Sequence, residues 1–297
     1  MLVAAALLAI GVGMALVLAS PRLQSGASGT QPARAPQRII SMSPNVTECI
    51  FAMGLGDRVV GVSDWTMYPP EARDKEVVGS ASAPSVERII ALRPDLIIVL
   101  GQQEKVAELC EQKGYPLLRM RMDRLETIYS GLQVLGERLG AEEEASGLID
   151  TVRWGLEGIE RQVGARPKPR VFLSLSRQPG TLAGVQTVSG ETLLSELVEV
   201  AGGRNIFDDL AIPYPEVSKE ALLERAPEVI LEIRPGEELT EARRRQLLAD
   251  WQAMPGLPAV RSGRVEFLTE SHLLVPGPRV VLAARRLALA LHPEALK

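Results

Sequence analysis

The stretch Ser85–Val99 reads SVERIIALRPDLIIV, and the stretch Ser218–Glu232 reads SKEALLERAPEVILE. Each copy opens with Ser, any residue and Glu, and continues with a helix-like apolar pattern. Each then closes with Pro, an acidic residue and an apolar run typical of a strand. The Glu lies seven residues before the Pro in both copies. The repeat predicts that the chain builds one small helix–strand unit twice, with a Glu at the same helix position each time.

Short apolar runs rich in β-branched residues alternate with helical patterns around these two stretches. The strand-like runs are residues 38–42, 58–62, 95–100 and 116–120 in the first half and 170–175, 228–233 and 264–268 in the second. Strands that alternate with helices form mainly parallel sheets covered by helices on both faces. The sequence therefore predicts an α/β fold with two similar Rossmann-like lobes.

One long helical pattern separates the two halves, over residues 141–163. Its apolar residues follow the spacing of a single helix face: Ala145, Leu148, Ile149, Val152, Leu156, Ile159 and Val163. At 1.5 Å per residue such a helix is about 35 Å long. We expect an N-terminal lobe over 37–140, a bridging helix over 141–164 and a C-terminal lobe over 165–297. A helical connection is stiff, so it permits rocking of the lobes but not a wide hinge swing.

The first 19 residues carry no charge, and residues 20–36 are rich in Ser, Gly, Pro and Ala. The first segment is long enough to span a bilayer, and the second reads as a flexible linker. We expect an exported protein whose residues 1–19 are either a cleaved signal peptide or a membrane anchor. A buried core helix is the alternative, but nothing amphipathic follows it. The segment has no Cys near its end to carry a lipid anchor.

Composition excludes several classes of protein. The 33 basic and 37 acidic residues give a net charge of −4, and no stretch clusters Lys and Arg densely, which argues against nucleic-acid binding. The chain has no G-x-S-x-G elbow, phosphate-binding Gly loop or H-E-x-x-H motif, and its two His cannot supply a three-His metal site. Cys49 and Cys110 form no metal pattern, and we expect buried free thiols rather than a disulfide. A periplasmic hydrolase or a metallochaperone stays open as the alternative of a different class.

Several segments together resemble one known family. They are RIISMSPNVTE (38–48), GVSDWTMYPPEA (61–72), NIFDDLAIPYPEVSKEALLERAPEVI (205–230) and PRVVLAARRLA (278–288). The chain resembles, over about residues 37–293, the solute-binding proteins of ABC importers that have a helical backbone, the class III periplasmic binding proteins. They capture cobalamin, haem, iron–siderophores or metal ions outside the cytoplasmic membrane. The IPYPEV segment is most similar to the cobalamin (vitamin B12) branch. The resemblance implies a periplasmic, monomeric transport protein with no enzyme activity and no cofactor.

The resemblance also gives the repeated Glu a role. In this family each lobe presents one Glu to Arg residues of the two-fold symmetric ABC permease, and the matching positions are Glu87 and Glu220. Each would be the second residue of a helix whose N-cap is Ser85 or Ser218, where a carboxylate stays ionised and exposed. Ordinary capping is the alternative. A capping box, however, places its Glu three residues after the cap.

The ligand is expected between the lobes, at the loops that follow the strand C-terminal ends. Trp65 and Tyr68 lie in the polar, Pro-rich loop SDWTMYPP, and Tyr214 lies in the IPYPEV loop of the second lobe. Aromatic rings there would cover the face of a large corrinoid or porphyrin ring. The alternative is that each loop packs on its own lobe. The resemblance maps Trp65 and Tyr214 onto ligand-facing aromatics of the cobalamin branch.

The chain also departs from the cobalamin branch. Ala81 stands where that branch has a Trp, and the segment TESHLLVPGPR offers Ser271, His272 and Val275 in place of an Asp, a Trp and an Arg. Some corrinoid contacts are therefore missing, and haem or a ferric siderophore is the alternative ligand. We include Ser271 and His272 in the expected site. His272 is either an axial ligand to a haem iron or cobalt or a hydrogen-bond donor.

Overall fold

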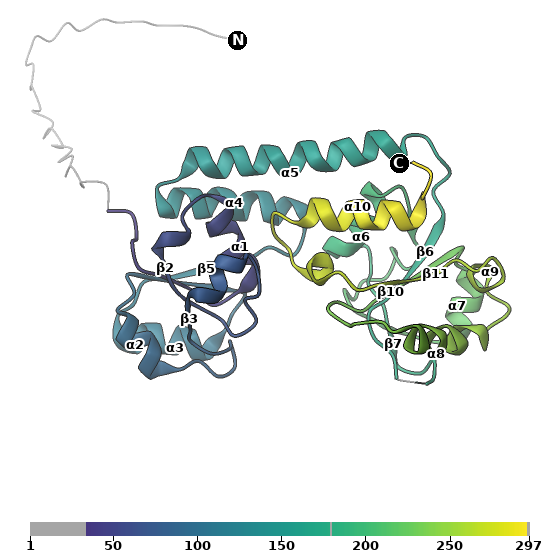
Figure 1. Cartoon of the computed structure of the whole chain (residues 1–297), viewed down its shortest axis with the longest axis horizontal. Helices are drawn as coiled ribbons and strands as arrows, with labels where there is room; N and C mark the ends of the chain where they lie inside the picture. The colour runs from purple at the N-terminus through teal and green to yellow at the C-terminus, as the bar shows by residue number, and fades with distance from the viewer. Residues whose placement is uncertain (1–33, 179, 296–297) are drawn as a thin grey trace, which may run out of the picture. The chain divides into compact units, whose positions relative to one another are not determined.

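The computed structural model describes residues 34–178 and 180–295 (Figure 1). The described residues from Ala35 onward form one compact unit. The predicted signal or anchor segment and most of the predicted linker lie outside the described residues. Within the described ranges no helix is long and apolar enough to cross a membrane.

The first lobe is built on a five-stranded sheet in the order β3-β2-β1-β4-β5, and every strand pair is parallel. Its elements are β1 (Ile39–Ser41), α1 (Pro44–Ala52), η1 (Gly56–Arg58), β2 (Val59–Val62), η2 (Pro70–Asp74), β3 (Glu76–Val77), α2 (Val86–Leu92), β4 (Leu96–Leu100), α3 (Glu104–Lys113), β5 (Leu117–Met120) and α4 (Leu125–Leu139). The central strands β1, β2 and β4 are largely buried, as expected of a parallel sheet covered on both faces, whereas the edge strand β3 is exposed.

The second lobe repeats this plan. Its sheet has the order β11-β10-β6-β8, again with parallel pairs, and β7 pairs with β9 as a separate antiparallel ribbon. Its elements are β6 (Arg170–Ser174), β7 (Val185–Gln186), α6 (Leu193–Val200), β8 (Arg204–Asn205), β9 (Glu216–Val217), α7 (Lys219–Arg225), β10 (Val229–Ile233), α8 (Glu241–Gln252), α9 (Pro258–Arg261), β11 (Val265–Leu268), η3 (Ser271–Leu274) and α10 (Val280–Leu291). The order β8-β6-β10-β11 matches β2-β1-β4-β5 strand for strand, so the predicted fold of two similar α/β lobes is confirmed.

The repeated stretches share their hydrogen bonds as well as their sequence pattern. In the first lobe the backbone N–H of Arg38 donates to Asp95 at 2.8 Å, and the Arg38 guanidinium donates to the Leu92 carbonyl that ends α2. In the second lobe the backbone N–H of Arg170 donates to Glu228 at 2.8 Å, and its guanidinium donates to the Ala226 carbonyl after α7. An Arg at the start of the first strand thus satisfies the free carbonyls of the repeated helix in both lobes.

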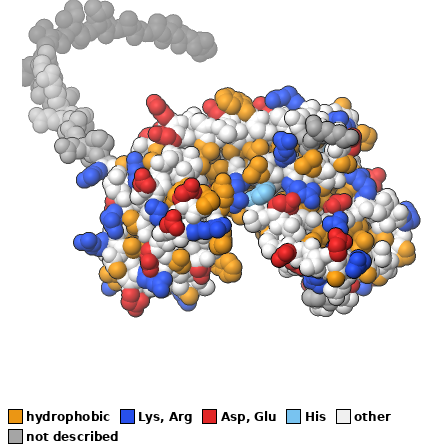
Figure 2. All heavy atoms as spheres, in the orientation of Figure 1, with side chains coloured by type: hydrophobic (Ala, Val, Ile, Leu, Met, Phe, Trp, Pro, Cys, Tyr) orange, Lys and Arg blue, Asp and Glu red, His pale blue; other side chains and the backbone are white. Residues whose placement is uncertain are grey.

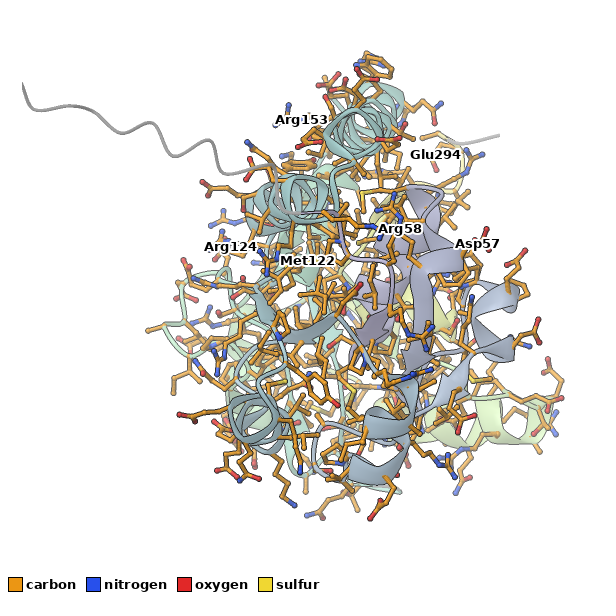
Figure 3. All side chains as sticks on the ribbon, turned by 90° about the vertical axis from the view of Figure 1, so that its left-hand side faces the viewer. Asp57, Arg58, Met122, Arg124, Arg153 and Glu294 are labelled. Atoms are coloured by element: carbon orange, nitrogen blue, oxygen red, sulfur yellow. The ribbon has the colours of Figure 1, made fainter. Side chains whose placement is uncertain are left out.

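One long helix, α5 (Glu142–Val163), joins the lobes. Figure 1 shows α5 running along both lobes, and it packs against α4 in the first and against α10 and α6 in the second. Gly136 and Gly155 permit close packing, because a Cβ at Gly136 would lie 2.6 Å from the Ala145 Cβ and one at Gly155 would lie 2.7 Å from Val281. Arg153 of α5, labelled in Figure 3, places its guanidinium 4.8 Å from the Tyr129 ring of α4.

The core beneath α5 is continuous between the lobes. A single cluster of buried apolar side chains runs from β1, α1 and α4 through α5 to α6, β10 and α10. Smaller clusters fill the outer layers, one around Ile89 and one around Phe172, Phe207 and Trp251. Cys49 and Cys110 are both buried free thiols, as predicted, and burial raises the pKa of each.

Candidate ligand-binding site and docking surface

The molecular surface is hollowed between the two lobes (Figure 2). We call this hollow the cleft. Segments that follow the strand C-terminal ends meet at the lobe junction, since Asn45 Nδ2, in α1 after β1, donates to the Pro276 carbonyl, after β11, at 3.1 Å. At a second point of this junction, the backbone N–H of Leu193, the first residue of α6, donates to the Asp123 carbonyl, after β5, at 3.1 Å. Both sheets therefore direct their C-terminal ends to the cleft, where open α/β sheets bind ligands.

Two of the predicted aromatic side chains are held out in solvent. Trp65 is 76% exposed and Tyr214 is 60% exposed. A turn positions Trp65, because Thr66 N donates to the Ser63 carbonyl at 3.1 Å. The β7–β9 ribbon continues to the Tyr214 loop, where Thr187 N donates to the Pro215 carbonyl at 2.9 Å. Neither ring is packed into the core of its lobe, and contact with a ligand stays a prediction for both.

Tyr68 has a different environment. The guanidinium of Arg279, from the other lobe, lies 4.0 Å from the centre of its ring, which leaves the side chain 44% exposed. A cation over an aromatic face is attracted by the ring quadrupole. Tyr68 therefore lies at the lobe junction, and its ring has one face already covered.

Ser271 and His272 lie in η3, directly after β11. Ser271 is exposed, whereas the Nε2 atom of His272 is buried and has no hydrogen-bond partner. Burial lowers the pKa of His272, and the positive charge of Arg279 lowers it further. Nε2 is therefore not exposed to solvent in this arrangement, and a ligand role for His272 stays a prediction. In the described part of the chain no group of three or more His, Cys, Asp or Glu side chains could hold a metal ion.

Sequence reasoning missed several residues near the predicted site. Met67 and Ile212 are large apolar side chains that stay exposed next to the loop aromatics in the sequence, and Arg279 lies over the ring of Tyr68. The signal for the first two was present, since each lies within three residues of Trp65 or Tyr214 in the sequence.

A separate open pocket of about 660 Å³ lies at the opposite, N-terminal ends of β6, β10 and β11, between residues such as Lys168, Glu228 and Arg264. It lies away from the strand ends that form the cleft.

The repeated Glu residues are both exposed on the first turn of a helix. Glu87 is the second residue of α2 and Glu220 is the second residue of α7. The Ser218 hydroxyl caps α7 by accepting from Ala221 N at 3.1 Å, whereas Ser85 makes no such cap. Hydrogen bonds from its own backbone N–H and from Ser218 lower the pKa of Glu220. That carboxylate is therefore ionised at neutral pH.

An exposed aliphatic side chain accompanies each Glu. Ile90 lies three residues after Glu87 and is 39% exposed, and Leu223 lies three residues after Glu220 and is 47% exposed. Residues three apart lie on the same face of a helix. Each lobe thus presents the same pair, one carboxylate and one aliphatic side chain.

The sequence profile of the Periplasmic binding protein family matches residues 39–271. The chain belongs to this family. A vitamin B12-binding protein of Yersinia pestis (strain Pestoides F) is 34% identical over 261 residues, 87% of this chain and 87% of that protein. The periplasmic vitamin B12 binding protein of Vibrio cholerae has a structure with a TM-score of 0.70 at 30% identity, covering 86% of this chain and 97% of that chain. A periplasmic heme binding protein from Pseudomonas aeruginosa has a TM-score of 0.72 at 25% identity, covering 88% and 94%.

The resemblance inferred from the sequence is therefore confirmed. Membership of the periplasmic binding protein family implies a location outside the cytoplasm, a small-molecule ligand and work with an ABC transporter permease. The relatives are named as binding proteins and not as enzymes.

Proposed function

We propose that this periplasmic binding protein captures cobalamin or a closely related corrinoid in the cleft and delivers it to an ABC importer. The observation that carries the proposal is the 34% identity to a vitamin B12-binding protein, which covers 87% of both chains and so includes both sides of the cleft. Trp65 on one lobe and Tyr214 on the other supply exposed aromatic surface. Aromatic side chains bury a large area against a flat ring, so these two are the expected clamps on the two sides of a corrinoid.

Haem is the second candidate, favoured by the likeness to the heme binding protein of Pseudomonas aeruginosa. Haem iron is held in proteins by His, Cys, Met or Tyr side chains. Because Nε2 of His272 is buried, the phenol of Tyr214 or Tyr68 is the better candidate for an iron ligand in this arrangement. A corrinoid needs no such ligand from the protein, because its aromatic and polar contacts can hold it. A ferric siderophore is the remaining alternative.

The docking role of Glu87 and Glu220 is also part of the proposal. Both carboxylates are exposed, and both occur at the same helix position on two similar lobes. A partner with two equivalent halves, as in a two-fold symmetric permease, would meet the same side chains twice. We assign Ile90 and Leu223 to this docking surface as its apolar part.

The remaining features complete the proposed role. Residues 1–19 direct export and are either cleaved or retained as a membrane anchor, with residues 20–36 as a linker. The N-terminal lobe (37–140), bridging helix (141–164) and C-terminal lobe (165–297) then act as a monomer. No resident cofactor or catalytic residue is part of this proposal.

Titration calorimetry of the purified protein with cyanocobalamin, haemin and a ferric hydroxamate siderophore tests the ligand assignment. We expect one cyanocobalamin bound per chain and weaker or no binding of the other two. Tight binding of haemin without cyanocobalamin binding would move the assignment to haem. Turnover of any ligand would revive the hydrolase alternative.

A further inference from the structure

An ion pair joins the C-terminal lobe to α1 of the N-terminal lobe. Arg279, the N-cap residue of α10, donates through Nε to Glu48 Oε2 at 2.8 Å and through Nη2 to Glu48 Oε1 at 2.5 Å. The Glu48 side chain is only 3% exposed and that of Arg279 is 15% exposed. Two parallel N–H···O bonds fix the orientation of both groups as well as their distance. The contact is therefore a directional one between lobes.

A second ion pair crosses in the opposite direction. Arg124, the N-cap residue of α4 in the N-terminal lobe, donates through Nε to Glu196 of α6 at 2.8 Å and through Nη1 to Glu191 at 2.5 Å. Figure 3 labels Arg124 near Met122, in the segment that leads into α4. Glu196 also accepts from the backbone N–H of Leu125 at 2.7 Å. The hydrogen bond to Glu196 raises the pKa of Arg124 above its usual value.

The two contacts occupy equivalent positions in the two lobes, although Arg279 binds both oxygens of one carboxylate and Arg124 divides its bonds between two. α4 and α10 follow the matching strands β5 and β11, and α1 and α6 follow the matching strands β1 and β6. In each lobe, the Arg that caps the last helix reaches a Glu within the first helix of the other lobe. The pattern is reciprocal, as a pseudo-two-fold arrangement of the lobes requires.

We propose that Arg279–Glu48 and Arg124–Glu196 are a reciprocal latch that fixes the separation and orientation of the lobes and so positions the two sides of the ligand site. The identity of the ligand in this inference rests on the proposed function, whereas the contacts between the lobes do not depend on it. Within the described residues α5 is the one chain crossing between the lobes, and the apolar core beneath it joins them through non-directional contacts. The two ion pairs add directional contacts on the two sides of the junction.

The latch also reaches a predicted ligand residue. The guanidinium that binds Glu48 is the one that lies 4.0 Å from the Tyr68 ring. Tyr68 and Trp65 lie in one loop. Loss of the Arg279 contacts would therefore loosen the orientation of the lobes and remove one support of that loop at the same time. We assign Arg124 and Arg279 as positioning residues, which act through the arrangement of the lobes.

The direct test measures the lobe separation in the full-length protein without ligand. Spin labels are attached at Glu111→Cys on α3 and Arg245→Cys on α8, in a Cys49→Ala/Cys110→Ala background, because both positions are exposed and lie on different lobes. Pulsed electron spin resonance then gives the distance distribution. The test variant is Glu48→Gln/Arg279→Met, which removes both charges and leaves no unpaired buried carboxylate. The matched control is Asp209→Asn/Arg225→Met, which removes a bidentate pair within one lobe.

We expect a broadened or shifted distance distribution in the latch variant and an unchanged one in the control, with further broadening when Arg124→Met is added. Arg279→Lys keeps the charge but not the two-bond geometry, and we expect it to give a distance distribution between those of the native protein and the latch variant. This single change also tests the proposal if the double variant does not fold. An unchanged distribution in folded latch variants would overturn the proposal.

Cyanocobalamin binding gives a second measurement. If the latch variant holds the competent lobe arrangement about a tenth of the time, its apparent affinity falls about tenfold at unchanged stoichiometry. Affinity equal to that of the control variant would contradict the positioning role. Failure of the native protein to bind cyanocobalamin would contradict the proposed ligand instead, and it would leave the distance measurement as it stands.

Discussion

Glu87 and Glu220 occupy the same place in two lobes: each is the second residue of the helix that precedes a matching strand, β4 or β10. Each is exposed, and each is followed three residues later by an exposed aliphatic side chain. Capping does not require this match, since Ser218 caps its helix and Ser85 does not. A partner that contacts both lobes in the same way would account for it, as we propose.

The docking surface makes the first prediction. Changing Glu87 or Glu220 to Ala should reduce uptake of ligand into vesicles that contain the permease, and the double change should reduce it further. Change to Lys should be worse, because it places like charges opposite the permease Arg groups. Ligand affinity of the isolated protein should not change. The control is Glu104→Ala, because Glu104 is an exposed first-turn Glu on α3 that is not part of the proposed docking surface. Undiminished uptake by the double variant would exclude docking as the role of the pair.

The cleft aromatics make the second prediction. Trp65→Ala or Tyr214→Ala should weaken cyanocobalamin binding by about 1 to 3 kcal/mol, as expected for the loss of a buried aromatic contact. The melting temperature should stay nearly constant, because both rings are exposed in the free protein. Calorimetry measures both quantities, and Trp154→Ala on the exposed face of α5 is the control. A large fall in melting temperature with unaltered affinity would show that the loops need these rings for packing.

The third prediction concerns pH. Burial and the charge of Arg279 lower the pKa of His272 below its usual value of 6.5. The unfolded chain therefore binds a proton at this side chain at a higher pH than the folded protein does. The contribution of His272 to stability is complete above pH 6.5 and is lost as the pH falls through the lowered pKa. Denaturant unfolding at a series of pH values should show a smaller fall in stability over this window for His272→Gln than for the native protein. An identical pH profile for both would contradict the assignment.

The boundary of the folded unit makes the fourth prediction. Because compact structure begins at Ala35, a chain that starts there should be a soluble monomer that unfolds cooperatively and binds one ligand per chain. Analytical ultracentrifugation and thermal unfolding measure this. Aggregation of the shortened chain would show that the N-terminal segment is part of the folded protein.

Most of the fold could be predicted from the sequence because its signals are local. The buried strands appear as apolar runs, and the face of α5 appears as an apolar stripe at helical spacing that is buried at Ala145, Val152 and Leu156. The repeated stretches placed Glu87 and Glu220 on the first turns of helices, where the structure has them. These features depend on residues within one turn or one strand of each other.

The features that could not be predicted depend on how distant segments meet. Glu48 and Arg279 are 231 residues apart, and nothing near either residue indicates the contact. The burial of the His272 Nε2 atom likewise follows from the packing of η3 against α10, to which no sequence motif corresponds. Tyr68 was predicted to contact the ligand, and nothing in its own loop indicates that a guanidinium from the other lobe lies over its ring.

The most direct test of the central claim is a competition between the two candidate ligands. The protein is mixed with equal amounts of cyanocobalamin and haemin and passed through a gel-filtration column, and the visible spectrum of the protein peak is recorded. The account predicts that the corrinoid band travels with the protein in about a one-to-one ratio, and that Trp65→Ala reduces it. A protein peak that carries the haem band alone, or neither band, would contradict the proposal that this periplasmic binding protein captures cobalamin.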